Sequence, residues 1–301
     1  MKVLVTGVAG QLGYDVINEL NKRGIVSIGA DVRFEEELVY RAKYDKYIQL
    51  DITDEESVSN TMKTIRPDAI IHCAAWTNVD AAEDSHNKCI VKKINVDGTE
   101  YLVKSAKEIG AKFLYISTDY VFNGEGSRPW RPDEKNYAPL NYYGQTKLEG
   151  ELIVSSQLEK FFIVRIAWVF GLNGKNFVRT MLMLASKGYK ELNVVDDQIG
   201  TPTYTYDLAR LLVDMIQTEK YGYYHATNEG GYISWADFAE TIFKLTNKNV
   251  KVNRVTTVEY GGSVAKRPFN SRLDKSKLLE KGFKPLPCWK DALKRYLEEI
   301  K

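Results

Sequence analysis

The sequence has few cysteines and histidines, which limits its metal and redox chemistry. The three cysteines, Cys73, Cys89 and Cys288, are odd in number and lie far apart. Such spacing suits neither a disulfide framework nor a zinc site, and it agrees with a reducing compartment. Three histidines among 301 residues argue against a histidine-rich metal site. We therefore expect a cytoplasmic protein without a metal.

The chain also lacks an excess of charge and any long apolar run. Lys and Arg number 42 and Asp and Glu number 40, so the net charge is +2. This balance argues against a partner bound through a bulk positive field, such as a nucleic acid or an anionic membrane. No apolar stretch approaches the roughly 20 residues of a membrane-spanning helix, and the N-terminus lacks a signal-peptide pattern. We expect a small-molecule partner and a monomer or homodimer.

Short β-branched runs alternate with longer amphipathic segments over the first 170 residues, which predicts strands and helices in turn. The strands are continuous apolar runs, a pattern typical of a parallel sheet that helices cover on both faces. The expected fold class is α/β, a Rossmann-type doubly wound parallel sheet. Strands are predicted at residues 2–6, 25–30, 47–50, 69–73, 112–117 and 161–167, and helices at residues 11–23, 55–65, 96–109 and 143–155.

The pattern becomes less regular after residue 171. We expect a smaller, mixed α/β substrate-binding domain over residues 171–301, beside a dinucleotide-binding domain over residues 1–170 that a segment near 200–228 rejoins. No linker rich in Pro, Ser or Gly separates them, so the expected ligand site is a cleft between closely packed domains. Helices are predicted near residues 177–187, 205–218, 235–245 and 291–299, and strands near 193–195, 223–226 and 250–254.

A glycine-rich turn follows the first predicted strand. Gly7, Gly10 and Gly13 form Gly-x-x-Gly-x-x-Gly, with Gln11 and Leu12 inside the motif at the start of the first helix. Glycine lets the backbone turn sharply and approach a pyrophosphate, whose charge is met by the free N–H groups of the helix N-terminus. These five residues are therefore candidate cofactor-binding residues. The alternative is a glycine-rich turn that binds nothing.

The second predicted strand is followed by an acidic residue and a basic one. Asp31 lies where a carboxylate accepts hydrogen bonds from ribose hydroxyls. An acidic residue there favours NADH because it repels a 2′-phosphate, but Arg33 lies two residues on and offsets that charge. The expected cofactor is therefore NADPH or NADH. The alternative for Asp31 is a polar residue that only ends a strand.

Two further strand ends carry candidate cofactor-binding residues. Asp51 and Ile52 follow the third strand and are placed to reach the adenine. Ala74, Ala75 and Thr77 follow the fourth strand and are placed to line the pyrophosphate and the nicotinamide ribose. The alternative for either segment is a plain loop.

One tyrosine and one lysine have the spacing of a proton-transfer pair. Tyr143 and Lys147 share one face of a helix, and of the 19 tyrosines only Tyr143 has Lys four residues later. Thr118 follows the fifth strand, so we expect all three at the carboxyl edge of the sheet. A phenol has a pKa near ~10, and a neighbouring ammonium with an oxidised nicotinamide stabilises its phenolate. Such a tyrosine protonates a carbonyl oxygen as hydride reaches the carbon, and Thr118 polarises that oxygen.

These motifs resemble the extended short-chain dehydrogenase/reductase family, and the resemblance covers essentially the whole chain. It is carried by the glycine motif, by the Tyr-x-x-x-Lys pair, and by residues 95–99 (Asn-Val-Asp-Gly-Thr) and 117–122 (Ser-Thr-Asp-Tyr-Val-Phe). The resemblance implies that Tyr143 is the proton donor, that Lys147 is its electrostatic and ribose-binding partner, and that Thr118 is the third catalytic residue.

Other segments narrow the resemblance to those family members that reduce 4-keto nucleotide sugars. They are residues 138–144, 168–170, 197–202 and 267–273. The resemblance implies that Asp119 and Trp168 contact the sugar nucleotide, and Arg267 is placed to meet its diphosphate. On the residues alone, Trp168 is equally well a core residue, Arg267 an exposed side chain that binds nothing, and Thr118 a hydroxyl that caps the strand end.

The resemblance implies NAD(P)H-dependent reduction of the 4-keto group of dTDP-4-dehydro-β-L-rhamnose. Related dehydratases carry Asp-Glu after the threonine as an extra acid and base, and related epimerases carry paired hydroxyl residues there. The segment Thr118-Asp119-Tyr120 has neither, and carbonyl reduction needs no further base. Two alternatives remain: a reductase of a different 4-keto nucleotide sugar, and a non-catalytic regulatory subunit resembling the methionine adenosyltransferase partner protein.

Overall fold

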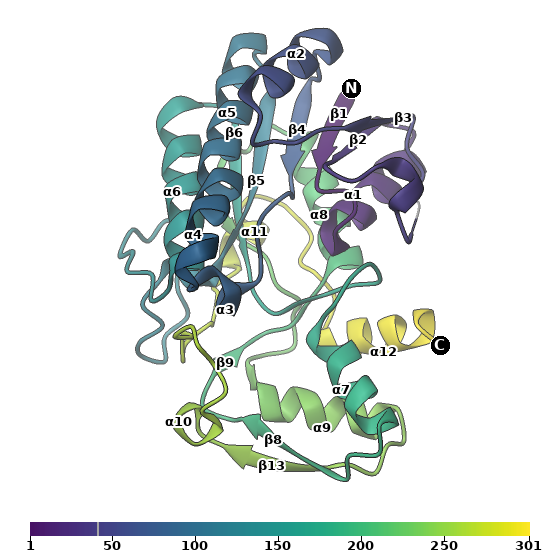
Figure 1. Cartoon of the computed structure of the whole chain (residues 1–301), viewed down its shortest axis with the longest axis vertical. Coiled ribbons are helices and arrows are strands. Elements are labelled where there is room, and N and C mark those ends of the chain that lie inside the picture. Colours follow the sequence, from purple (N-terminus) through teal and green to yellow (C-terminus); the bar gives the residue numbers. More distant parts are fainter. Residues whose placement is uncertain (41) are drawn as a thin grey trace.

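The structure, a computed structural model, describes residues 1–40 and 42–301. Figure 1 shows a larger lobe, built on a sheet between helices, and a smaller lobe that is built from segments of the second half of the chain. The smaller lobe contains α7 (Phe177–Ser186), β8 (Glu191–Val195), α9 (Trp235–Leu245) and β13 (Lys251–Val255). These four elements all come from the part of the chain after residue 171.

The larger lobe contains a parallel sheet of seven strands within the described residues. The strands are β1 (Lys2–Thr6), β2 (Val26–Asp31), β3 (Lys46–Gln49), β4 (Ala69–His72), β5 (Lys112–Thr118), β6 (Phe161–Ile166) and β11 (Gly222–His225). Their order is β11-β6-β5-β4-β1-β2-β3, which confirms the predicted doubly wound α/β fold. Six strands lie where the apolar runs predicted them, and β11 returns from the later part of the chain to pair with β6.

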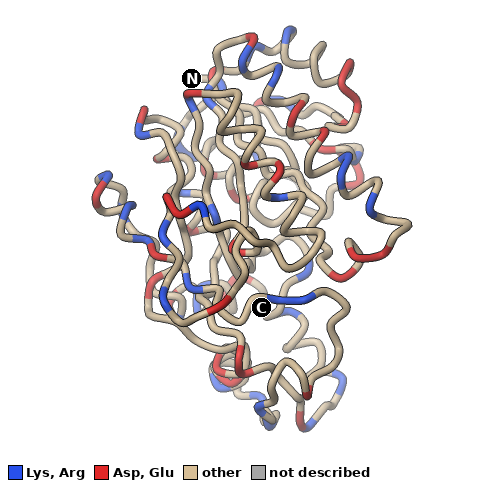
Figure 2. Tube along the Cα trace, turned by 90° about the vertical axis from the view of Figure 1, so that its left-hand side faces the viewer, with Lys and Arg blue, Asp and Glu red and all other residues tan. Residues whose placement is uncertain are grey.

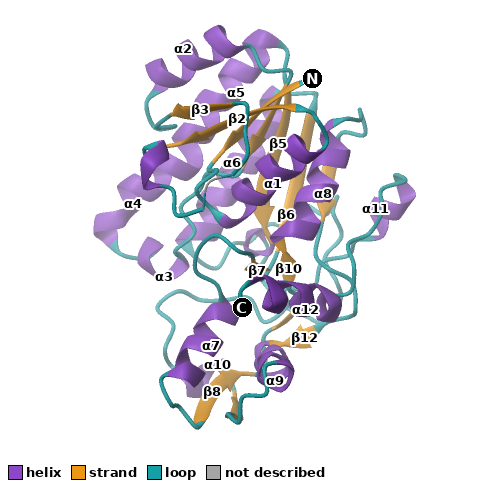
Figure 3. Cartoon of the chain, turned by 90° about the vertical axis from the view of Figure 1, so that its right-hand side faces the viewer, coloured by secondary structure: helices purple, strands orange, loops and turns teal. Residues whose placement is uncertain are grey.

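Helices bury both faces of this sheet, as Figure 3 shows from the side. They are α1 (Gln11–Lys22), α2 (Glu55–Ile65), α5 (Gly98–Ile109), α6 (Tyr142–Gln157) and α8 (Thr205–Ile216). Alternate side chains of a strand point to opposite faces. Val3 and Val5 of β1 accordingly pack with α1 and α8, whereas Leu4 packs with α2, α5 and α6. Burial on both faces explains why these strands are continuous apolar runs.

The segment between β4 and α5 is more helical than the sequence predicted. It contains α3 (Val79–Ala82), α4 (Ser85–Lys92) and a π-helical turn, η2 (Lys93–Asp97). In that turn the Asn95 side chain accepts a hydrogen bond from the Trp76 backbone N–H (2.8 Å) and donates one to Thr146 Oγ1 (3.0 Å). Asn95 therefore ties the loop after β4 to α6, the helix that carries Tyr143.

The smaller lobe has its own core, in which α7 and α9 pack with α12 (Trp289–Glu299). Its parallel pair β8 and β13 was predicted from the sequence in outline. Several elements were not predicted because two to five residues give no readable period: β7 (Val169–Phe170), β9 (Ile199–Gly200), β10 (Thr203–Tyr204), β12 (Ile233–Ser234), α10 (Thr257–Tyr260), α11 (Ser276–Glu280) and the 3₁₀ turns η1 (Glu35–Glu37) and η3 (Asp119–Val121).

One segment from the second half of the chain returns to the larger lobe. Both α8 and β11 come from the segment near 200–228, and both lie in the larger lobe. The boundary between residues 170 and 171 stays a prediction. Figure 2 shows both signs of charge spread over both lobes, as the near-zero net charge implied. Among the described helices, none has the length and apolar character needed to cross a membrane.

Candidate active site

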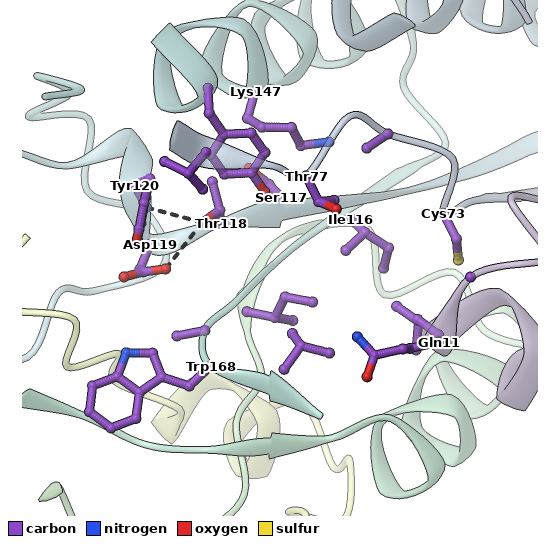
Figure 4. A pocket seen from close by; sticks show the side chains of 18 of the residues that line it. Gln11, Cys73, Thr77, Ile116, Ser117, Thr118, Asp119, Tyr120, Lys147 and Trp168 are labelled. Atoms are coloured by element: carbon purple, nitrogen blue, oxygen red, sulfur yellow. Dashed lines mark hydrogen bonds between the residues drawn. The ribbon is translucent and has the colours of Figure 1, made fainter. Parts of the chain in front are cut away.

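A cavity of about 590 Å³ lies at the carboxyl ends of β1, β4, β5 and β6, and residues of both lobes form its walls (Figure 4). This edge is where doubly wound sheets bind ligands. The cavity brings together most of the predicted site residues: Gly7, Gly10, Gln11, Leu12, Gly13, Ala75, Thr77, Thr118, Asp119, Tyr143, Lys147, Trp168 and Arg267.

The glycine-rich turn has the shape that a dinucleotide phosphate requires. Gly7 has φ +72°, and a Cβ there would lie 2.6 Å from the backbone nitrogen of Ala74. A Cβ on Gly13 would lie 2.2 Å from the carbonyl oxygen of Gly7. Gly10 precedes α1, and no side chain in the described residues caps that helix. The first N–H groups of α1 thus face the cavity with room for a phosphate, so these residues fit a dinucleotide cofactor.

Four of the predicted cofactor residues lie outside the walls of this cavity. Asp31 accepts a hydrogen bond from the Ala9 backbone N–H (2.9 Å), so part of its role is to hold the glycine-rich turn. Asp51 accepts hydrogen bonds from its near neighbour Thr53, and the Ile52 side chain is buried in the core. Ala74 is the fourth. Their contact with a cofactor stays a prediction.

The segment 173–176, which we call the strap, joins β7 to α7 and contacts the glycine-rich turn. No motif in the sequence predicted this contact. Asn173 Nδ2 donates to the carbonyl oxygen of Ala9 (3.0 Å), and Asn176 Nδ2 donates to Gln11 Oε1 (2.9 Å). Lys175 lies between these two anchors and lines the cavity. Its ammonium is therefore a candidate phosphate contact beside the N-terminus of α1.

The predicted catalytic side chains lie in one wall of the cavity, at the start of α6 and the end of β5. Asn141 caps α6 by accepting from the Gly144 N–H (2.8 Å). Lys147 is buried, with Nζ 4.0 Å from the ring centroid of Tyr115. Thr118 lines the same wall as Tyr143, and its Oγ1 donates to Asp119 Oδ1 (3.1 Å). The cap and the strand end thus bring the tyrosine and the threonine together.

Burial shifts the two titratable groups toward their neutral forms. Desolvation lowers the pKa of Lys147 to about 7, although the negative charge of Glu151 acts in the opposite sense. We expected Lys147 to stabilise the Tyr143 phenolate. In the structure the pKa of Tyr143 is instead raised, because the phenol is buried and the Asp119 carboxylate repels the phenolate. Tyr143 therefore keeps its proton at neutral pH, as a proton donor must.

Two polar atoms beside these residues are buried without a hydrogen-bond partner among the described residues: Ser117 Oγ and Asp119 Oδ2. Burial raises the pKa of Asp119 to about 6, while hydrogen bonds from Ser271 and Thr118 act in the opposite sense. Buried polar groups without partners are uncommon and costly. Their position in the wall of the cavity makes them candidate contacts for the hydroxyl groups of a substrate.

Trp168 lies across the cavity from Thr118 and Asp119 (Figure 4). Its backbone is left-handed, with φ +52°. The indole stacks on Trp235, with ring centroids 3.7 Å apart and planes 13° apart. An aromatic face beside a polar wall suits a sugar ring, whose C–H groups pack on the ring while its hydroxyl groups bond elsewhere.

Arg267 lines the cavity, but it already has an anionic partner. Its guanidinium forms two hydrogen bonds with the carboxylate of Asp80, at 2.5 and 3.1 Å. The same carboxylate accepts backbone hydrogen bonds from Val264 and Ala265. Arg267 thus closes a loop onto α3. A diphosphate would have to share this arginine with Asp80.

The sequence did not single out the smaller-lobe residues of the cavity: Lys175, Phe177 and Trp235. Phe177 and Trp235 each fit the apolar pattern of a helix, so a role in the core was sufficient to explain them. No group of three or more metal-ligating side chains occurs among residues 1–40 and 42–301.

Comparison with known proteins places the chain in a family. The family described as the RmlD substrate binding domain matches residues 1–301. The chain belongs to the RmlD substrate-binding domain family. A member from Bacillus subtilis, the spore coat polysaccharide biosynthesis protein SpsK, is 37% identical over 99% of this chain and 97% of its own length. The dTDP-4-dehydrorhamnose reductase of Escherichia coli K12 is 35% identical over 100% of this chain and 98% of its own.

Solved structures from this family have the same architecture as the chain. A dTDP-4-dehydrorhamnose reductase from Clostridium acetobutylicum is 39% identical, with a TM-score of 0.90 over 100% of this chain and 99% of that one. A dTDP-4-dehydrorhamnose reductase from Bacillus anthracis, solved in complex with NADP, is 38% identical, with a TM-score of 0.89 over 99% of this chain and 100% of that one.

Proposed function

We propose that the chain is an NAD(P)H-dependent reductase that converts dTDP-4-dehydro-β-L-rhamnose to dTDP-β-L-rhamnose. The observation that carries the proposal is one cavity in which a glycine-lined helix N-terminus faces Tyr143, Thr118 and Lys147. The names of relatives that match the whole chain support this choice of substrate.

The residues around the glycine-rich turn would hold the cofactor. The N–H groups at the start of α1 and the ammonium of Lys175 lie where a pyrophosphate would be neutralised, and Lys147 would bond the nicotinamide ribose. When bound, a reduced nicotinamide supplies a hydride to a carbonyl carbon. The relative from Bacillus anthracis was solved with NADP, and we propose NADPH or NADH for this chain.

Tyr143 is the proton donor in this proposal. Its hydroxyl keeps its proton because burial and Asp119 raise its pKa. The O–H bond of Tyr143 breaks as the carbonyl oxygen of the sugar becomes a hydroxyl. Thr118, which lines the same cavity, would hydrogen-bond the same oxygen and polarise it. The ammonium form of Lys147 stabilises the phenolate that remains.

Residues on both walls of the cavity would select the substrate. The unpartnered atoms Ser117 Oγ and Asp119 Oδ2 would bond sugar hydroxyl groups, and Trp168 would pack on the sugar ring. Arg267 would meet the diphosphate in place of part of its contact with Asp80. Each of these roles rests on position in the cavity and on the chemistry of the side chain.

The test follows the absorbance of NADH and of NADPH with a panel of dTDP- and UDP-4-keto sugars. We expect oxidation with the dTDP-4-keto-6-deoxy sugar and a dTDP-rhamnose product. Oxidation only with another member of the panel would change the substrate but keep the reaction. If no 4-keto sugar is reduced and a methionine adenosyltransferase co-purifies, the chain is a regulatory subunit instead.

We propose also that the protein is cytoplasmic and is a monomer or a homodimer. The cysteines Cys73, Cys89 and Cys288 are free, which suits a reducing compartment. Light scattering of the purified protein would measure its mass against the 34.3 kDa of one chain. A measured mass larger than that of a dimer would contradict the proposed monomer or homodimer.

A further inference from the structure

Trp168 has a backbone conformation that tryptophan rarely adopts. Its φ is +52°, and it lies between β6 and β7, where the chain leaves the sheet for the smaller lobe. A left-handed conformation of a bulky residue persists only when its surroundings fix it. The contacts that fix Trp168 therefore identify the residues that set the position of its ring.

Two contacts enclose the indole of Trp168. Trp235 stacks on its face, with ring centroids 3.7 Å apart. Gly200 lies at its edge, where a Cβ would be 2.9 Å from Cε2 and 3.0 Å from Nε1 of the indole. The backbone is held as well, because the Thr203 N–H donates to the carbonyl oxygen of Trp168 (3.0 Å). The ring thus fits between a flat aromatic face and a position without a side chain.

Trp235 is itself fixed by the smaller lobe. It is the first residue of α9, which Ser234 caps by accepting from the Asp237 N–H (3.1 Å). The Ser234 hydroxyl also donates to Asp196 (2.6 Å), at the end of β8. Phe177 of α7 packs on the Trp235 ring, with centroids 4.6 Å apart. Elements of the smaller lobe therefore fix the orientation of Trp235.

We propose that Trp235 is a positioning residue, which with Gly200 holds the Trp168 indole at the angle that receives the sugar of the substrate. This inference rests on the proposed reductase function. Trp235 acts through Trp168: without the stacking face, the left-handed backbone relaxes and the indole leaves the wall of the cavity. The smaller lobe thereby sets sugar affinity, while cofactor binding depends on the larger lobe and the strap.

Steady-state kinetics of variants on both sides of the indole test this inference. Trp235→Leu should raise KM for the 4-keto nucleotide sugar about 10-fold, with a smaller change in kcat and an unchanged Kd for NADPH. Trp235→Phe should restore most of the affinity. Gly200→Ala should give the KM change of Trp235→Leu with Trp235 still present. Tyr189→Leu, an exposed aromatic residue of the same lobe outside the cavity, should behave as the wild type.

A double-mutant cycle separates positioning from independent binding. If Trp235 acts through Trp168, Trp168→Leu/Trp235→Leu is no worse than Trp168→Leu alone. The inference would be overturned if the increases in KM of the two single variants multiply in the double variant. It would also be overturned if Trp235→Leu loses as much affinity for NADPH as for the nucleotide sugar. Thermal unfolding of each variant checks that it is folded. If Trp235→Leu is not folded, Gly200→Ala takes its place in the cycle, because it disturbs the Trp168 indole from the other side.

A measurement without substrate separates this inference from the proposed function. Stacked indoles contribute jointly to near-ultraviolet circular dichroism, so Trp168→Leu and Trp235→Leu should lose the same band and the double variant no more. An inactive wild type that shows this shared band would contradict the reductase function but not the stacking. An active wild type whose single variants lose different bands would contradict the positioning role of Trp235.

Discussion

At the scale of single residues, burial shifts the pKa values of Tyr143 and Lys147, the pair that we propose transfers the proton. The pKa of the phenol is raised and that of the amine is lowered, so both neutral forms are favoured. Glu151 lies one turn beyond Lys147, but a 2.7 Å ion pair with Arg165, fully buried on both sides, occupies its carboxylate. The Lys147 amine is therefore only weakly compensated and titrates close to neutral pH.

Tyr143→Phe removes the proposed proton donor and leaves the ring. We expect kcat to fall by about 10² or more with the Kd for NADPH nearly unchanged, because general-acid catalysis is lost while the cavity keeps its shape. NADPH oxidation measures the first and a fluorescence titration the second. Tyr142→Phe is the matched control, because the Tyr142 hydroxyl donates to the carbonyl oxygen of Lys88 and does not line the cavity. Near-normal turnover of Tyr143→Phe would contradict the mechanism.

Lys147→Met tests the lowered pKa through stability. The native amine loses its proton above a pH of about 7, whereas the unfolded amine keeps it up to about 10.5. The unfolded state binds more protons in that window, so the wild type should gain stability relative to the variant as pH rises through it. Urea unfolding between pH values of about 6 and 9 measures the difference in free energy. A difference that does not change with pH would contradict the lowered pKa of Lys147.

At the scale of elements, the junction of β1 and α1 determines where a cofactor can bind. The turn is tight because the backbone of Gly7 is left-handed. In addition, the start of α1 lies so close to the end of β1 that a Cβ on Gly13 would collide with the Gly7 carbonyl oxygen. Asp31, from the end of β2, holds the same turn through the Ala9 N–H. The strap at Asn173 and Asn176 then fixes its outer side. Three elements therefore fix the turn that we propose binds the cofactor phosphates.

Gly7→Ala and Gly24→Ala separate backbone strain from steric conflict. Gly7 and Gly24 have similar positive φ, +72° and +65°, but no described atom lies within 4 Å of a Cβ at Gly24. Gly24→Ala should cost about 1–2 kcal/mol for the left-handed alanine. Gly7→Ala should cost about 1–3 kcal/mol more and weaken NADPH binding. Urea unfolding and cofactor titration measure both effects, and equal losses would show that the turn tolerates a side chain.

At the scale of the whole molecule, buried polar contacts hold the two lobes together. Arg295 of α12 forms a two-bond contact with Asp207 of α8, at 2.9 and 2.7 Å. Asn176 also joins Gln11 of α1 to Tyr296 of α12. These contacts fix the width of the cavity, because its walls come from both lobes.

Arg295→Met should leave Asp207 as an unpaired buried charge. The Asp207 side chain has 0% exposure and that of Arg295 has 33%. We expect a loss of about 2–3 kcal/mol, below the roughly 3–5 of a fully buried pair because solvent reaches the arginine. Asp291→Asn removes the exposed partner of the same arginine and should cost less than about 0.5 kcal/mol. Equal effects of the two variants in urea unfolding would show that the lobes do not depend on this pair.

Much of the fold and part of the site were readable from the sequence, because their signals are local. Largely apolar runs predicted six of the seven strands, since most of the sheet is buried on both faces, and the short run near residues 223–226 predicted the seventh. The glycine motif predicted the turn after β1. One helical turn places Tyr143 and Lys147 on the same face, so their spacing alone predicted that the two side chains lie together. The carboxyl edge of the sheet then placed Thr118 beside them.

The rest was decided only by tertiary structure, because it depends on contacts between distant segments. Nothing near Trp235 in the sequence indicates that its ring stacks on Trp168, and nothing near Lys175 indicates that it reaches the glycine-rich turn. The sequence determined the chemistry that the chain carries. The packing of the smaller lobe on the sheet determined which side chains surround the cavity. The sequence could not show this, since an aromatic residue in a helix follows the same apolar periodicity whether it faces a core or a cavity.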